Sequence, residues 1–276
     1  MKTLFKGIAT ALVTPFRNGE IDFKSLGKLI ESQIRDGINA LVVLGTTGEA
    51  STIDDEEREQ IVEFAVMQVN GRIPIIVGIG GNNPRKIIEY GLQAKRAGAD
   101  GVMISAPYYN KCTQDGAYKF FADITKCLQI PTIVYNVPGR TGINMEAATM
   151  VKISKLKHVV GIKEASGNIV QIMETIRDSK VPVYSGDDAL SFLCYILGAR
   201  GTISVASNLV PREAIEIFDL ASQNKIRRAR ALFNSQLPLY HSLFVQPNPI
   251  PVKYYLSKKG ICRNELRLPL TPMKDS

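Results

Sequence analysis

Of the lysines in this sequence, only Lys163 ends an apolar strand-like run, Val159-Val160-Gly161-Ile162-Lys163. A strand that is buried on both faces is continuously apolar, so a lysine at its end is held against surroundings of low dielectric constant. Desolvation disfavours the ammonium form and lowers the pKa of the amine. A neutral amine attacks carbonyl carbons, so this position points to imine chemistry. The competing interpretation is a structural lysine paired with a carboxylate such as Glu164.

Two further side chains could act on a substrate held by that lysine. Tyr135 ends the preceding strand-like run, and neighbouring strands lie about 5 Å apart, so its phenol can reach the same substrate. A tyrosine that is hydrogen-bonded to hydroxyls, such as those of Thr46 and Thr47, is a competent proton shuttle. Arg140 follows in a Pro-Gly turn, where a guanidinium can clamp a carboxylate. The ordinary alternatives are a buried tyrosine with a satisfied hydroxyl and an exposed loop arginine.

Other catalytic chemistries lack the residues they need. The chain has two histidines, His158 and His241, and four scattered cysteines without a C-x-x-C pair, which argues against a zinc site. Neither histidine lies near a nucleophile motif of the Ser-His-Asp kind. The glycine-rich stretch 78–83 has neither G-K-[ST] nor G-x-G-x-x-G spacing, so it is interpreted as a tight turn between strand and helix. We expect four reduced cysteines and no metal.

The charge balance fits a small anionic substrate better than nucleic acid. The net charge is +8, from 34 Lys and Arg against 26 Asp and Glu, but the excess is not concentrated in an arm. Its densest cluster, 225–230, reads as the solvated face of a helix, and no nucleic-acid-binding module is recognisable. No apolar run reaches the roughly 18 residues of a membrane helix, and the N-terminus lacks the features of a signal peptide. We therefore expect a cytoplasmic protein with no membrane or nucleic-acid partner.

Eight strand-like runs alternate with helical patterns along the chain. The runs cover Ile8–Val13, Ala40–Leu44, Ile73–Val77, Gly101–Ser105, Thr132–Tyr135, Val159–Lys163, Val183–Ser185 and Thr202–Val205. Between them, Asp54 with Glu57 predicts a capping box, and Asn83-Pro84 predicts a helix start. Three helices are expected to end at glycine-led turns, which begin at Gly37, Gly98 and Gly198. The recurrence indicates a weakly repeated β-α unit.

Eight β-α units predict an α/β fold of the (β/α)8, or TIM-barrel, type, with an open doubly wound sheet as the alternative. We expect the barrel core in residues 1–208 and the last barrel helix with a helical C-terminal extension in residues 209–276. In such barrels the active site lies at the carboxyl ends of the strands, where small and polar residues cluster in this sequence. Lys163, Tyr135 and the Thr46-Thr47 pair all fall at these ends.

With these residues in place, the chain closely resembles the 4-hydroxy-tetrahydrodipicolinate synthase (dihydrodipicolinate synthase) family of class I pyruvate-dependent aldolases. The likeness runs almost end to end. Its motifs are Gly45-Thr46-Thr47-Gly48-Glu49, the stretch 135–141, Gly161-Ile162-Lys163-Glu164-Ala165, Ser185-Gly186-Asp187-Asp188 and the stretch 244–253. Jointly these motifs are specific, whereas the first alone would be weaker.

The resemblance implies condensation of pyruvate with L-aspartate 4-semialdehyde through an imine on Lys163, without metal or pyridoxal phosphate. It implies that Tyr135 is the proton donor and acceptor, relayed through Thr46 and through Tyr109, the last supplied by a neighbouring subunit of a homodimer or homotetramer. It also implies binding roles: Thr47 would hold the pyruvate carboxylate, Arg140 the semialdehyde carboxylate, and the backbone around Gly186 and Ile203 would line the pocket.

Two departures from the family pattern are expected to matter. Relatives continue into a last helix beyond the point where this sequence stops, at Ser276. The regulatory site that binds L-lysine in inhibited relatives is only partly kept. Its positions here are Ser51, Asp55, Arg58, Gly80, Asn82, Lys86 and Tyr108, and Asp55, Arg58 and Lys86 replace histidine, histidine and glutamate. Because cations replace an acceptor, we expect the enzyme to be nearly insensitive to L-lysine.

Two alternative functions stay open at this point. A sister aldolase that joins pyruvate to a sugar aldehyde, such as N-acetylneuraminate lyase, would share Lys163 and Tyr135; Arg140 and the Thr46-Thr47 pair favour the synthase. A non-catalytic ligand-binding barrel would be expected to have lost Lys163 or Tyr135, and both are present.

Overall fold

The computed structural model describes residues 3–274. Eight strands in this part of the chain close into a parallel barrel. Each strand pairs with the strands before and after it in the chain, and the first pairs with the last. The predicted (β/α)8 architecture is therefore confirmed, and the open sheet is wrong. The barrel strands are β1 (Gly7–Ala11), β4 (Ala40–Val43), β5 (Ile75–Gly78), β6 (Gly101–Ser105), β7 (Thr132–Asn136), β8 (Val159–Glu164), β9 (Val183–Ser185) and β10 (Gly201–Ser204).

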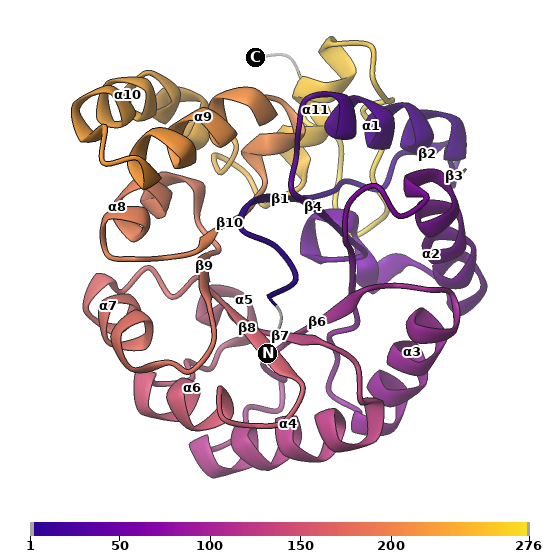
Figure 1. Ribbon diagram of the computed structural model, residues 1–276. Helices are drawn as coiled ribbons and strands as arrows, with labels where there is room; N and C mark the ends of the chain where they lie inside the picture. Colours follow the sequence, from indigo (N-terminus) through magenta and orange to yellow (C-terminus); the bar gives the residue numbers. More distant parts are fainter. Residues whose placement is uncertain (1–2, 275–276) are drawn as a thin grey trace.

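Helices form an outer ring around these strands (Figure 1). They are α1 (Phe23–Arg35), α2 (Asp55–Val69), α3 (Pro84–Arg96), α4 (Gln114–Leu128), α6 (Ala147–Ile153), α7 (Ile169–Asp178), α8 (Ser191–Ile196) and α9 (Pro211–Ser222), with a short α5 (Pro138–Thr141) at the carboxyl end of β7. The helical extension follows as α10 (Ile226–Ser242) and α11 (Ile250–Lys258). Figure 1 shows the yellow C-terminal segment beside α1 and a hairpin of two short strands, β2 (Phe16–Arg17) and β3 (Glu20–Ile21).

The helix boundaries follow the local signals in the sequence. Asp54 and Glu57 form the predicted capping box of α2, and the Asn83 side chain accepts a hydrogen bond at the start of α3. Gly37, Gly98 and Gly198 have φ angles of 89°, 92° and 103°, which a residue without Cβ adopts easily. Each glycine thus turns the chain from a helix into the next barrel strand.

The predicted strand bounds lie within one residue of the observed ones except for two, which are off by two residues, and both of these errors have a structural cause. The third run was expected from Ile73, but β5 begins at Ile75, after Pro74, which has no N–H to donate to a ladder. The first run was expected to reach Val13, but β1 ends at Ala11 because the Asn208 side chain accepts from the Val13 N–H in place of a neighbouring strand.

A hairpin was missed altogether. The short strands β2 (Phe16–Arg17) and β3 (Glu20–Ile21) pair antiparallel around Asn18-Gly19, whose φ angles are 55° and 87°. The Asn-Gly dipeptide is a strong hairpin signal. The boundary between a core at 1–208 and an extension at 209–276 stays a proposal, and the outermost residues of both segments, 1–2 and 275–276, lie outside the described residues.

The inside of the barrel is filled by its own apolar cluster, separate from the layer between strands and helices. The cluster contains Phe5, Ala9, Ala11, Ala40, Val42, Ile76, Met103, Ile133, Tyr135, Tyr184 and Ile203. At the amino end of the strands, Phe5 stacks on Tyr184 with ring centroids 4.3 Å apart, and the Tyr184 hydroxyl donates to the Phe5 carbonyl at 2.7 Å. These contacts close the barrel floor, so a group on the inner wall is shielded from water on that side.

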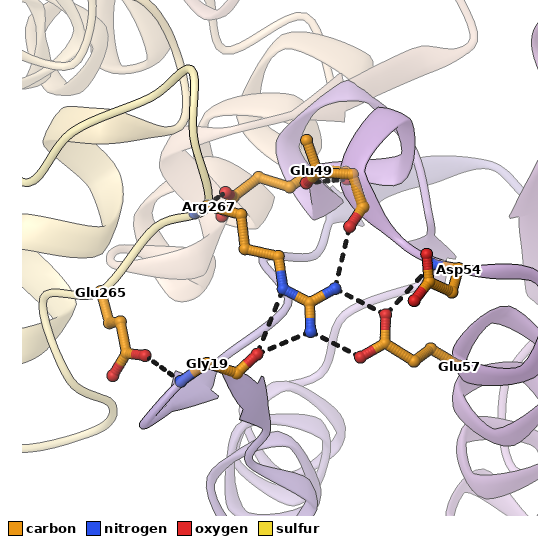
Figure 2. A network of polar contacts seen from close by, with 7 residues as sticks. Gly19, Glu49, Asp54, Glu57, Glu265 and Arg267 are labelled. Atoms are coloured by element: carbon orange, nitrogen blue, oxygen red, sulfur yellow. Dashed lines mark hydrogen bonds and ion pairs between the residues drawn. The ribbon is translucent and has the colours of Figure 1, made fainter.

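A buried ion pair attaches the C-terminal extension to the barrel mouth. Lys253 Nζ, on α11, lies 2.6 Å from Glu49 Oε1, and the two side chains are 0% and 2% exposed. The Arg267 N–H donates to the other oxygen of Glu49 at 3.1 Å. Figure 2 shows the Arg267 guanidinium between the Gly19 carbonyl and the Glu57 carboxylate. The extension is therefore bonded both to the turn after β4 and to the β2–β3 hairpin.

We expect Lys253→Met to lower the free energy of unfolding by about 3–5 kcal/mol, because it leaves the Glu49 carboxylate buried without its cation. Urea denaturation followed by circular dichroism measures this loss. The double variant Glu49→Gln/Lys253→Met removes both charges and should be less destabilised than Lys253→Met alone.

The control is Arg212→Ala. It breaks an ion pair of similar length, 2.7 Å to Asp36, but the arginine side chain is 70% exposed, so the expected loss is about 0–1 kcal/mol. Equal losses in Lys253→Met and Arg212→Ala would contradict a dominant role for the buried pair.

Candidate active site

Lys163 projects into the barrel from β8 in register with Tyr135 on β7. Its side chain is 5% exposed, and Nζ lies 4.1 Å from the centroid of the Tyr135 ring. Side chains alternate between the two faces of a strand, so Glu164 points to the outer face. There its carboxylate accepts from the Ser166 N–H at 2.7 Å and from Asn136 Nδ2 at 3.2 Å. The interpretation of Lys163 as a partner of Glu164 is therefore wrong.

Two glycines leave the space that the long Lys163 side chain needs. A Cβ at Gly161, two residues earlier on the same face, would lie 3.0 Å from the Tyr184 ring. A Cβ at Gly186 would lie 3.0 Å from Lys163 Cε and 2.7 Å from the Ala165 Cβ. Because such contacts are tighter than ordinary van der Waals distance, a larger residue at either position would crowd the inner wall around the amine.

Burial sets the protonation state of both groups. Desolvation lowers the pKa of Lys163 to about 7; the Asp188 carboxylate opposes this shift, and the Arg140 charge adds to it. Burial also raises the pKa of Tyr135 to about 12, with Arg140 opposing that shift. Near neutral pH a large fraction of the amine is therefore unprotonated, and the phenol keeps its proton. An amine that can act as a nucleophile therefore lies beside a phenol that can donate a proton.

Asp188 is a buried carboxylate that sequence analysis did not single out. It accepts from Ser204 Oγ at 2.5 Å and from the Val205 and Ala206 N–H groups at 3.0 and 2.9 Å. These bonds join the 3₁₀ turn η3 (Asp188–Leu190) to the carboxyl end of β10. Burial raises the pKa of Asp188, and these three hydrogen bonds oppose that shift. In its ionised form Asp188 raises the pKa of Lys163, and in either form it holds the neighbouring loop.

A cavity of about 170 Å³ opens above Lys163. Thr46, Thr47, Tyr135, Arg140 and Gly186, all predicted site residues, line it with the lysine. Ile203 does not; it lies in the apolar cluster inside the barrel, and Val205 lines the cavity instead. Besides Val205, eight lining residues were given no role from the sequence: Ala11, Gly45, Met103, Val137, Ala165, Asp187, Phe244 and Asn248. Phe244 and Asn248 come from the C-terminal extension.

Thr46 and Thr47 occupy the 3₁₀ turn η1 (Thr46–Gly48) directly after β4. The Glu49 N–H donates to the Thr46 carbonyl at 3.1 Å and closes this turn, with Glu49 itself at a φ of 53°. The Thr14 hydroxyl donates to the Gly48 carbonyl at 2.7 Å. The turn therefore presents two adjacent hydroxyls to the cavity from a fixed backbone.

Tyr109 lies apart from the cavity residues. Its side chain is 90% exposed and its φ angle is 67°. It lines neither the smaller cavity nor the larger one beside it. Its expected part in a proton relay supplied by a neighbouring subunit stays a prediction.

The larger cavity, about 530 Å³, is bounded by six of the seven residues predicted for the regulatory site: Ser51, Arg58, Gly80, Asn82, Lys86 and Tyr108. Tyr135 and Arg140 line both cavities, so the two adjoin at the barrel mouth. The seventh residue, Asp55, binds Lys86 Nζ at 2.6 Å and accepts from the Tyr90 hydroxyl at 2.6 Å. Glu89 lies 3.1 Å from the same ammonium.

Arg58 forms the buried wall of the larger cavity and is 4% exposed. Its guanidinium donates to the carbonyls of Gly78 and Ala50 at 3.1 and 3.2 Å and lies 4.2 Å from the centroid of the Tyr90 ring. Burial lowers the pKa of Arg58 from its usual value. These contacts fix the cation in the wall and use its terminal donors on backbone groups.

The described part of the chain, residues 3–274, contains no group of three or more His, Cys, Asp or Glu side chains that could hold a metal ion. None of its helices is both long and apolar enough to cross a membrane.

Comparison with known proteins gives one consistent result. The model of the dihydrodipicolinate synthetase family matches residues 4–276. The 4-hydroxy-tetrahydrodipicolinate synthase of Thermotoga neapolitana is 45% identical over 278 residues, which cover 99% of this chain and 95% of the relative. The crystal structure of dihydrodipicolinate synthase from Thermotoga maritima matches with a TM-score of 0.97 at 43% identity, covering 99% of this chain and 94% of that chain.

A further solved structure bears on the substrate. It is the chloride-inhibited dihydrodipicolinate synthase of Acinetobacter baumannii in complex with pyruvate, with a TM-score of 0.96 at 41% identity, covering 99% of this chain and 94% of that chain. The sequence motifs, the closed barrel and the family model agree over almost the whole length, and the chain belongs to the dihydrodipicolinate synthetase family.

Proposed function

We propose that the chain catalyses the condensation of pyruvate with L-aspartate 4-semialdehyde to 4-hydroxy-tetrahydrodipicolinate, in diaminopimelate and lysine biosynthesis. The observation that carries the proposal is the buried amine of Lys163, with its lowered pKa, beside the protonated phenol of Tyr135. The names of the relatives agree with this activity.

The first half of the reaction forms an imine. The neutral Lys163 amine attacks the ketone carbon of pyruvate, and water leaves as the C=N bond forms. Tyr135, which keeps its proton near neutral pH, is the donor to the departing oxygen and afterwards an acceptor. The positive imine nitrogen then acts as the electron sink when a methyl proton leaves, and an enamine results. The negative charge of Asp188 favours the cationic imine.

The second half joins the two substrates. The enamine carbon attacks the aldehyde carbon of the semialdehyde and forms the new C–C bond. The substrate's own amine then displaces Lys163 from the imine carbon and closes the ring, which frees the enzyme. The net change is loss of one water, so no redox partner is required. Thr47 would hold the pyruvate carboxylate and Arg140 the semialdehyde carboxylate, since both side chains line the cavity above Lys163.

The sister reaction with a sugar aldehyde is less well supported. Arg140 gives the cavity a cationic group that suits a second carboxylate, whereas a sugar aldehyde calls for hydroxyl-binding groups. The homo-oligomeric state, the cytoplasmic location and the independence from metal and cofactor stay proposals.

One experiment tests the activity and its nucleophile together. Reduction with borohydride in the presence of pyruvate should add the mass of a reduced pyruvyl group at Lys163, and product should form with the semialdehyde but not with N-acetylmannosamine. A label on another lysine would overturn the mechanism. Product from N-acetylmannosamine would favour the sister aldolase.

Imine formation should rise with pH around 7. The nucleophile is the neutral amine, and its pKa is about 7, so the reactive fraction is small below that pH and nearly complete above it. Between pH 6 and pH 8 the initial rate at subsaturating pyruvate should increase roughly tenfold. Samples incubated with labelled pyruvate at each pH are quenched into one common borohydride buffer, so the reduction step is constant. A flat profile would show that the amine does not titrate in this range.

Arg140→Ala should impair use of the semialdehyde far more than use of pyruvate. A hydrogen bond to a charged group contributes about 1.5–3 kcal/mol, so kcat/KM for the semialdehyde should fall roughly 10- to 150-fold. Arg140→Lys keeps the charge but loses the planar fork of the guanidinium. Its kcat/KM for the semialdehyde should therefore lie between the values of the wild type and of Arg140→Ala. Equal losses for both substrates would make Arg140 a structural residue, held by its bond to the Asn248 carbonyl.

Inhibition by L-lysine should be weak, as expected from the sequence, but the structure gives a different reason for part of the effect. Repulsion from Lys86 is reduced because Asp55 and Glu89 pair with it, but that pairing also occupies the carboxylates that an incoming ammonium would need. Arg58 adds a fixed cation in the cavity wall. Initial rates at subsaturating pyruvate, with L-lysine to about 10 mM and D-lysine as the control for ionic strength, should show no half-inhibition below roughly 1 mM, a binding free energy near −4.1 kcal/mol. Tighter inhibition by the L isomer alone would contradict this.

A further inference from the structure

Asn248, in the loop before α11, contacts the side chains of Thr47 and Arg140. In the proposed function these are the two side chains that hold the carboxylates of the substrates. Its side chain is buried, 5% exposed, and lines the cavity above Lys163. Its Nδ2 donates to Thr47 Oγ1 at 2.9 Å, and its main-chain carbonyl accepts from Arg140 Nη2 at 3.0 Å. One residue of the C-terminal extension therefore joins the turn after β4 to the loop after β7.

The direction of the bond to Thr47 has a chemical consequence. An amide nitrogen can only donate, so the Thr47 hydroxyl is the acceptor in this bond. A hydroxyl carries a single proton, and the bond to Asn248 leaves that proton free. Within residues 3–274, no protein acceptor is bonded to it. Thr47 faces the cavity, so its proton is available to an anion bound there.

Both ends of this bond are anchored by the same buried ion pair. Glu49 follows Thr47 by two residues and closes the turn that carries it. Lys253 follows Asn248 by five residues and lies in α11, and its ammonium is bonded to Glu49 at 2.6 Å. The Asn248 Oδ1 atom is buried and has no partner among the described residues, so the bond to Thr47 is the one hydrogen bond that orients the amide there.

We propose that Asn248 is a positioning residue for pyruvate binding: its side-chain amide makes Thr47 a hydrogen-bond donor toward the pyruvate carboxylate. The inference rests on the proposed function and adds to it the residue that determines which way the Thr47 hydroxyl points. Arg140 is held by the main chain of Asn248, so side-chain substitutions at Asn248 leave that contact in place.

Two variants at Asn248 test the direction of the bond. Asn248→Ala removes the donor to Thr47 and should raise the pyruvate concentration for half-maximal imine trapping about 10-fold. Asn248→Asp is isosteric, but its carboxylate accepts the Thr47 proton and repels the pyruvate carboxylate, so the rise should reach roughly 100-fold. For Asn248→Ala, which adds no charge to the cavity, kcat at saturating pyruvate and KM for the semialdehyde should change by less than about twofold.

A double-mutant cycle tests whether Asn248 acts through Thr47. Thr47→Val alone should weaken pyruvate binding about as much as Asn248→Ala, and the double variant should be no weaker than Thr47→Val. Additive losses would overturn the proposal, as would unchanged pyruvate affinity in Asn248→Asp or equal KM changes for both substrates. If Asn248→Ala does not fold, the isosteric Asn248→Asp and Thr47→Val decide the question.

Labelling of Lys163 distinguishes failure of the proposed function from failure of the positioning role of Asn248. If the wild-type protein gains no reduced pyruvyl group at Lys163, the proposed function itself fails. If the wild type is labelled and the Asn248 variants show the same dependence on pyruvate concentration, only the positioning role fails.

Discussion

The desolvation of one amine is the constraint on which the rest of the site depends. In the proposed mechanism Lys163 can act as a nucleophile near neutral pH only because the inner wall of the barrel lowers its pKa to about 7. That wall is dry because Phe5 and Tyr184 close the floor, and it has room because Gly161 and Gly186 have no side chain. The same surroundings raise the pKa of Tyr135, so one physical cause supplies both a neutral base and a retained proton.

A buried amine alone does not select a substrate, because selection needs neighbouring groups in fixed positions. The C-terminal extension helps to fix those groups. The Glu49–Lys253 pair is bonded inside the protein, where removal of one charge is far more costly than at the surface. It fixes the turn that carries Thr46 and Thr47 against the segment that carries Asn248. The barrel thus supplies the reactive groups, and the extension orients the groups that bind substrate around them.

The sequence predicts the parts that depend on short-range patterns. Continuous apolar runs and glycine-led turns indicate the eight strands, and the pairing of consecutive strands brings Tyr135 into register with Lys163. The side-chain period of two also decides that Glu164 faces away from the lysine. The contacts of the extension have no such signal. Asn248 and Thr47 are 201 residues apart, and Lys253 and Glu49 are 204 apart, so no local period encodes either pair.

The cavity above Lys163 has two ends that are built differently. The end that we propose binds pyruvate consists of buried groups, Lys163, Tyr135 and Thr47, whose positions depend on the strands and the fixed turn. The other end depends on Arg140, an exposed residue of the short helix α5, whose guanidinium donates to the main-chain carbonyl of Asn248. In the proposed function Arg140 meets the aldehyde substrate from this helix, and its charge also lowers the pKa of Lys163. A change at Arg140 would therefore alter the group that meets the aldehyde and, through that charge, the amine that forms the imine.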